Sequence, residues 1–133
     1  EYESKLMGEK QRASNPNIKS EPTLESIINI FRYLDSEGVK IIGALDMGMS
    51  RADFNKAVAS AWVHVEWLGF DHWKAIRSIT TTNAEALRIE KSKGLLIEGF
   101  DADVVYYKND PSLNIRNLVF NPLHVIKNGE VVF

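Results

Sequence analysis

A single carboxylate stands directly after the most apolar run of the chain. Residues 39–45 (VKIIGAL) are rich in β-branched side chains and nearly all apolar. Such a run predicts a strand buried on both faces, as in a parallel sheet. Asp46 follows it, at the edge of the sheet where α/β enzymes place metal ligands and proton acceptors. Asp also commonly forms turns and helix caps, so position alone leaves both roles open for Asp46.

The three histidines do not add a metal site to this carboxylate. We expect His64 on the polar side of a helix, His72 at a helix start and His124 in a strand near the C-terminus. No two of them have the spacing of metal ligands on one element. The chain has no Cys, which excludes thiolate ligands and disulfides. We therefore expect each histidine to be an ordinary surface or packing residue.

Helical patterns lie on both sides of the apolar run. Apolar side chains at helical spacing predict a helix from Thr23, with Pro22 in its first turn and Gly38 at its end. A second apolar stripe from Phe54 predicts a helix that Gly69 breaks. Helix, buried strand and helix in succession indicate an α/β unit.

Further helix and strand signals follow toward the C-terminus. Asp71 is expected to cap a third helix, and Asn83 a short fourth helix through Leu87. Residues 104–107 (VVYY) predict a strand closed by the turn at residues 109–111. The Asn-Gly pair at residues 128–129 predicts a hairpin turn between two last strands.

Composition narrows the classes of function. The 133 residues carry a formal net charge of -2, so nothing indicates a nucleic-acid partner. The longest apolar stretches fall short of the ~18 residues that span a bilayer, so no membrane role is expected. The lack of Cys fits a reducing compartment, and we expect a cytoplasmic protein.

Three segments, in this order, resemble the metal-dependent amidohydrolase superfamily. Residues 75–87 (AIRSITTTNAEAL) resemble its last barrel helix and a Thr-Asn-Ala stretch. Residues 93–105 (KGLLIEGFDADVV) resemble its signature of two glycines and Ala-Asp before an apolar strand. Residues 125–132 (VIKNGEVV) match its closing hairpin. The resemblance is closest to the branch of imidazolonepropionase and related cyclic-amide and dipeptide hydrolases.

The resemblance implies an α/β fold: the C-terminal portion of a (β/α)8 TIM-type barrel, followed by strands of a small composite β-sandwich. Residues 1–22 would form a polar loop, residues 23–90 the last barrel elements, and residues 91–133 the sandwich strands. The matching glycines and Asp103 would be structural, with Asp103 in a turn or cap. The chain would then be the C-terminal part of a longer enzyme.

The resemblance places the chemistry at Asp46. In the family, this Asp binds the metal and takes a proton from the water that the metal activates, during hydrolysis of a C–N bond in a cyclic amide or amide-like substrate. Met47, Gly48 and Arg51 would line the rim of the pocket, and Arg51 would pair with a substrate carboxylate or lie on a helix surface. The metal would be divalent, with Zn first and Mn or Fe as alternatives.

The family's His-x-His pair and its other ligands are not found in the sequence. The expected partners are therefore the remainder of the hydrolase, in a second chain or a preceding portion, and a small-molecule substrate. This chain alone would be incomplete and inactive. Ala44 and Leu45 also stand where the family often has a small residue and a hydroxyl. These two departures favour an alternative, a non-catalytic binding or assembly module on the same scaffold.

Overall fold

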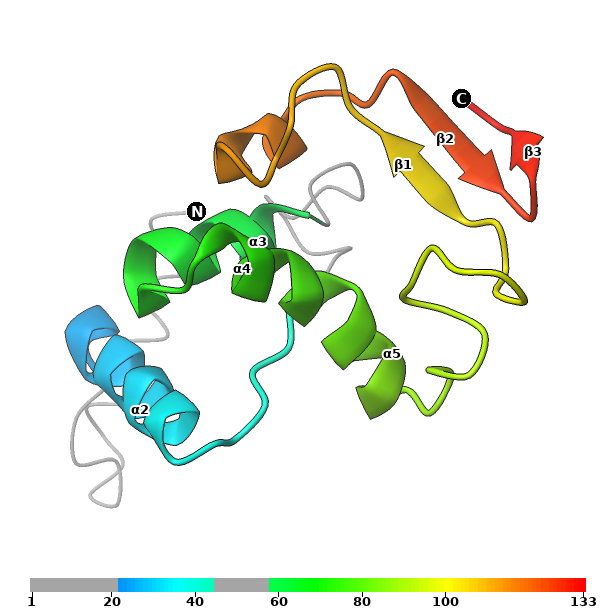
Figure 1. Ribbon diagram of the computed structural model, residues 1–133. Helices are drawn as coiled ribbons and strands as arrows, with labels where there is room; N and C mark the ends of the chain where they lie inside the picture. The colour runs from blue at the N-terminus through cyan, green and yellow to red at the C-terminus, as the bar shows by residue number, and fades with distance from the viewer. Residues whose placement is uncertain (1–21, 45–57) are drawn as a thin grey trace, which may run out of the picture.

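The first described helix lies where the sequence predicts it, with one correction at its start. In the computed structural model, residues 22–44 and 58–133 are described, and helix α2 (Leu24–Ser36) comes first (Figure 1). Thr23 is its N-cap, and the side chain accepts a hydrogen bond from the Ser26 amide at 3.1 Å. Pro22 therefore precedes the cap instead of lying in the first turn. Gly38 follows the helix with a φ of 80°, a conformation that favours glycine.

The predicted buried strand is not formed over the residues of it that the structure describes. Residues 39–44 are extended, but they lie in no sheet, and Val39 and Ile42 are exposed. A parallel strand needs a hydrogen-bonded neighbour on each side and a cover on each face. The described residues supply neither, so this part of the prediction is not confirmed.

Four short helical segments form the centre of the molecule. They are α3 (Ala59–Val63), the π-helix η2 (His64–Leu68), α4 (His72–Ile79) and α5 (Thr81–Ala86). Gly69 ends the π-helix with a φ of 77°, as predicted. Asp71 caps α4, and its carboxylate accepts a hydrogen bond from the Lys74 amide at 2.8 Å. The cap position of α5 belongs to Thr80, so the predicted capping role of Asn83 is wrong.

The C-terminal region folds into a small antiparallel sheet. Strands β1 (Val104–Tyr106), β2 (His124–Lys127) and β3 (Glu130–Val131) lie in the order β1-β2-β3. The β2–β3 register pairs Lys127 with Glu130. Asn128 and Gly129 both have positive φ values, 51° and 83°, as a two-residue type I′ turn requires. The predicted hairpin is confirmed, whereas a second sheet, which a sandwich needs, is not found among the described residues.

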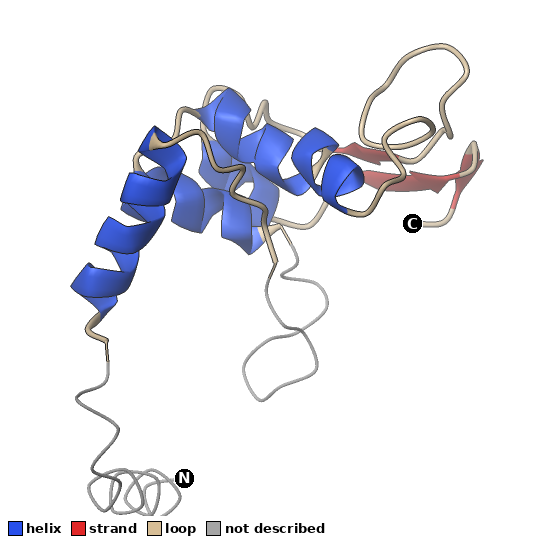
Figure 2. Ribbon diagram, turned by 90° about the horizontal axis from the view of Figure 1, so that it is seen from below, coloured by secondary structure: helices blue, strands red, loops and turns tan. Residues whose placement is uncertain are grey.

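The small core joins the helices to the C-terminal region. Ala61, Phe70, Ala75, Ile115 and Leu118 are buried together. The last two come from the 3-10 helix η3 (Ile115–Val119), which lies between β1 and β2 in sequence and packs on α3. Figures 1 and 2 show the helices gathered at one end and the sheet at the other. In the part of the chain that is described, no helix is long and apolar enough to cross a membrane.

Candidate functional site

The residues predicted to do chemistry lie just beyond a described segment. Asp46, Met47, Gly48 and Arg51 fall within residues 45–57, outside the described part of the chain. Their predicted roles are therefore not tested here. The extended segment 39–44 ends two residues before Asp46, so it is the described part of the chain that lies nearest to that carboxylate in sequence.

The backbone amide and the backbone carbonyl of Gly43 are both hydrogen-bonded, one to α4 and the other to α5. Its amide donates a hydrogen bond to the Ser78 carbonyl at 2.9 Å. Its carbonyl accepts one from Nδ2 of Asn83, also at 2.9 Å. Lys40 forms an ion pair with Glu85 earlier in the same segment. The segment that precedes Asp46 is thus hydrogen-bonded to residues about forty positions further along the chain.

The close approach at Gly43 leaves no space for a side chain. A Cβ added to Gly43 would lie 2.4 Å from Cγ2 of Ile79 and 2.6 Å from Oγ of Ser60. Both neighbours belong to packed helices, and Ser60 is buried. Glycine is therefore required by the packing of the extended segment against α3 and α4.

A buried polar pair lies beneath this contact. Oγ of Ser78 donates to the Ala75 carbonyl at 2.7 Å and lies 2.8 Å from Nδ1 of His64. Because the hydroxyl has one proton, the ring nitrogen must be the donor in this second bond. Burial lowers the pKa of His64, so the neutral ring is favoured.

The helical spacing predicted His64 on a polar surface, but the structure shows the side chain buried. Tertiary packing accounts for the difference, because Ser78 of α4 contacts the His64 ring and buries it. The ring also packs against Phe70, with centroids 5.4 Å apart. The expectation that His64 is a packing residue is confirmed, and only its face is corrected.

Asn83 is the residue whose role the sequence pattern did not reveal. It lies inside α5, and its side chain reaches back to Gly43 instead of capping its own helix. Its Oδ1 atom is buried and has no hydrogen-bond partner within residues 22–44 and 58–133. Thr80 takes the N-cap position of α5 without a side-chain capping bond, and its hydroxyl donates to the Ile76 carbonyl at 2.8 Å.

The two other histidines are also used structurally. Nδ1 of His72 lies 2.8 Å from the Ser112 carbonyl, and His124 stacks on Tyr106 with centroids 6.5 Å apart. Among the residues that the structure describes, no three His, Asp or Glu side chains are grouped so that they could hold a metal ion. The described residues therefore do not fit a complete metal site, and Asp46 is the ligand that the chain is predicted to offer.

An apolar groove runs beside the end of the extended segment. Its volume is about 240 Å³. It is lined by α2, by the extended segment and by the π-helix, through Leu24, Ile27, Ile28, Phe31, Ile41, Ile42, Ala44, Val63, His64, Trp67 and Leu68. Several of these side chains are exposed, among them Leu24 at 55%. The face that carries the segment toward Asp46 is thus apolar and uncovered by described residues.

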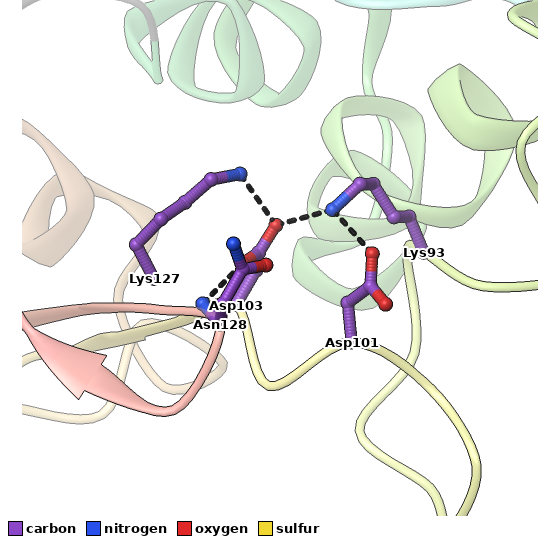
Figure 3. A network of polar contacts seen from close by, with 5 residues as sticks. All are labelled: Lys93, Asp101, Asp103, Lys127 and Asn128. Carbon is purple, nitrogen blue, oxygen red and sulfur yellow. Dashed lines mark hydrogen bonds and ion pairs between the residues drawn. The ribbon is translucent and has the colours of Figure 1, made fainter.

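The acidic residue of the Ala-Asp motif has a structural role, as predicted (Figure 3). Oδ2 of Asp103 contacts Nζ of Lys93 at 2.6 Å and Nζ of Lys127 at 2.9 Å. Its Oδ1 accepts a hydrogen bond from the Asn128 amide at 2.9 Å. These contacts hold the pKa of Asp103 well below its usual range. Asp103 thereby connects the loop before β1 to the turn between β2 and β3.

Comparisons with known proteins show which family the chain belongs to. The sequence profile of the Amidohydrolase family matches residues 9–132. A solved structure of a putative prolidase from Bifidobacterium longum is similar, with a TM-score of 0.76 and 25% identity over 80% of this chain and 26% of that one. A Xaa-Pro dipeptidase with bound methionine in its active site gives a TM-score of 0.71 and 33% identity over 80% and 25%. No curated protein matches the sequence.

A fold likeness extends to a more distant enzyme. The A. niger ochratoxinase gives a TM-score of 0.67 at 23% identity, over 80% of this chain and 24% of that one. The chain thus spans about a quarter of the length of these solved structures. The match over nearly the whole sequence shows that the chain belongs to the amidohydrolase family. Membership in the imidazolonepropionase branch stays a prediction.

Proposed function

We propose that this chain is part of a hydrolase that cleaves amide C–N bonds, and that it contributes Asp46 to the active site. The observation that carries the proposal is the family match over residues 9–132. The hydrogen bonds at Gly43 support it, because they fix the segment that leads to Asp46 at two backbone atoms. Fixed backbone of this kind is what a preorganised catalytic group requires.

The named structural neighbours favour a linear dipeptide-like substrate. Two of them, at 25% and 33% identity, are described as a putative prolidase and a Xaa-Pro dipeptidase. A dipeptide has a free carboxylate at one end. The planar guanidinium of Arg51 can pair with such a carboxylate in two parallel hydrogen bonds. We propose Arg51 for that contact and place Met47 and Gly48 at the rim of the same pocket, with a cyclic amide as the alternative substrate.

We propose that Asp46 both binds a divalent metal and accepts a proton during hydrolysis. The metal would be Zn, with Mn or Fe as alternatives, and most of its ligands would come from residues outside this chain. A bound divalent metal lowers the pKa of water and polarises a carbonyl group. The carboxylate of Asp46 would stay ionised beside that charge, and would hold the proton until the leaving amine takes it.

We further propose that the remainder of the hydrolase covers the apolar face. The chain spans 26% and 25% of the first two solved relatives. The groove beside residues 39–44 is lined by large apolar side chains from α2 and η2. Elements of a barrel would cover such a face and would pair with the extended segment on both sides. The strand predicted for residues 39–45 would then form in the complete enzyme.

The substrate class is tested by assaying the intact hydrolase against matched panels. One panel holds dipeptides, including Xaa-Pro, and the other holds cyclic amides of similar size. We expect turnover of dipeptides, its loss on chelation, and its recovery when Zn is restored. Turnover of cyclic amides alone would replace the substrate assignment. Tight binding of either panel without turnover, with or without added metal, would favour the non-catalytic module.

A further inference from the structure

The hairpin turn between β2 and β3 carries a chemically reactive pair of residues. Asn128 and Gly129 form the only Asn-Gly pair in the sequence, and both are exposed. Asparagine is one of the labile side chains of proteins, because the backbone nitrogen of the next residue can attack its side-chain carbonyl carbon, Cγ. Glycine has no side chain to hinder this attack. The pair that suits a type I′ turn therefore also places a reactive amide at that turn.

The folded turn keeps the attacking nitrogen occupied. The Gly129 amide donates a hydrogen bond to the Ala102 carbonyl at 3.0 Å. The Asn128 amide donates to Oδ1 of Asp103 at 2.9 Å. The attack requires the Gly129 nitrogen to leave Ala102 and to turn toward the Asn128 side chain. The reaction can therefore begin only when the turn opens away from the segment before β1.

Asp103 holds this turn closed from the side of β1. Besides the bond from Asn128, its Oδ2 atom contacts Nζ of Lys93 at 2.6 Å and Nζ of Lys127, the last residue of β2, at 2.9 Å (Figure 3). We propose that Asn128 is a site of spontaneous deamidation, and that Asp103 suppresses the reaction by holding the turn closed. This inference depends on neither the substrate nor the metal of the proposed function.

The reaction needs water and no other reactant. The Gly129 nitrogen forms a bond to Cγ of Asn128 and gives up its proton, while the bond from Cγ to Nδ2 breaks and Nδ2 leaves as ammonia. The product is a five-membered cyclic imide. Water then opens the ring at either of its two carbonyl carbons. One opening leaves an aspartate at position 128, and the other leaves an isoaspartate, whose backbone contains one additional methylene group.

Both products would weaken the small sheet. Each puts a new carboxylate on the residue whose amide binds Asp103, and like charges at close range are destabilising. The isoaspartate also lengthens the two-residue turn. Because loop length fixes the register of a hairpin, the pairing of Lys127 with Glu130 would not be kept. The modified turn would then stay open.

The test follows deamidation in the intact hydrolase, incubated in a mildly alkaline buffer. Digestion and mass spectrometry measure the acid fraction at position 128 over time, for the folded parent and for the parent denatured in urea. Asp103→Ala removes the proposed restraint. Asp101→Ala is the matched control, because the Asp101 carboxylate pairs among the described residues with Lys93 alone. Asp103→Asn, which keeps an acceptor for the Asn128 amide, replaces Asp103→Ala if that variant does not fold.

We expect the folded parent to deamidate at least about tenfold more slowly than the denatured parent, which corresponds to a local opening free energy of about 1.4 kcal/mol or more. Asp103→Ala should approach the denatured rate, Asp103→Asn should lie between the two, and Asp101→Ala should match the folded parent. An unchanged asparagine in the denatured parent, or equal rates in the folded and denatured parent, would overturn the proposal. A folded Asp103 variant with the rate of the parent would overturn the role of Asp103.

Discussion

Asp103 shows how one carboxylate can hold three parts of a small sheet region. It contacts Lys93 from the loop after α5, Lys127 at the end of β2, and the Asn128 amide in the hairpin turn (Figure 3). Lys93 also contacts Asp101 at 2.7 Å. The two carboxylates raise the pKa of Lys93 above its usual range, so the lysine stays charged wherever the fold persists.

Replacing Asp103 by Asn should lower the melting temperature at neutral pH by more than the same change at Asp101. The oxygen of the new side-chain amide would still accept the bond from Asn128, but both ion pairs would be lost. The carboxylate of Asp101, in contrast, forms one ion pair among the described residues, with Lys93. The folded pKa of Asp103 is depressed. Its contribution is therefore complete above the unfolded value of about 3.9 and is lost as the pH falls below it.

Thermal melts of the parent, Asp103→Asn and Asp101→Asn, recorded from pH 7 down to pH 2, test this expectation. The gap between the parent and Asp103→Asn should narrow as the pH falls below about 4. It should also narrow in high salt, because these groups are partly exposed to solvent. A gap that stays constant across pH would show that the ion pairs are not its cause.

At the scale of elements, the conformation of the hairpin is determined by local sequence, whereas the position of the extended segment 39–44 is determined by contacts that are distant in sequence. The hairpin follows from its own sequence, since Asn128 and Gly129 adopt positive φ values that few other residues accept. The extended segment is held by Ser78 and Asn83, far along the chain. The strand at residues 39–45 was predicted from apolar content. Apolar content indicates that a segment is suited to a buried position, but it does not identify the neighbouring strands that a sheet needs.

The same contrast explains which side-chain roles could be predicted. Local signals were sufficient for the Thr23 and Asp71 caps and for the structural use of Asp103. The burial of His64 and the reach of Asn83 both depend on tertiary packing. Neither of these two tertiary contacts produces a periodic pattern or a motif spacing in the sequence. The proposed role of Asp46 in the active site therefore stays a prediction that rests on the family resemblance.

Two glycine-to-alanine variants should distinguish the effect of the extended segment on kcat from the effect of the sheet on stability. In Gly43→Ala the new Cβ meets Ile79 and Ser60 at 2.4 and 2.6 Å, so the segment must move. We expect kcat of the intact hydrolase to fall roughly 100-fold. In Gly129→Ala the positive φ should cost about 1–2 kcal/mol of stability, with kcat per folded enzyme unchanged. Equal kcat in both variants would contradict the link between Gly43 and the active site.

At the scale of the whole molecule, the described residues leave a large apolar face in water. Along the groove, Leu24 of α2 is 55% exposed, Ile42 45% and Trp67 40%. The buried core of the described residues has five members, two of them alanine. Contiguous exposed apolar surface of this kind marks an interface, and the proposed occupant is the remainder of the hydrolase.

The isolated chain of 15.1 kDa should therefore bind a hydrophobic dye and associate as its concentration rises. Addition of the remaining portion of the hydrolase should reduce dye binding, because the apolar face becomes covered. Size exclusion with light scattering, together with dye fluorescence, measures both. A monomer that unfolds cooperatively and binds no dye would contradict the proposed partner.

The most direct test of the account is the change of Asp46 to Ala in the intact hydrolase. Turnover of the best dipeptide and the metal content are measured on the same purified sample, with Asp103→Ala as the matched carboxylate control. We predict that Asp46→Ala loses turnover by about 1,000-fold or more, as expected for removal of a proton acceptor that also binds metal. Asp103→Ala should lose stability and keep kcat. Retained turnover with normal metal content in Asp46→Ala would contradict the account.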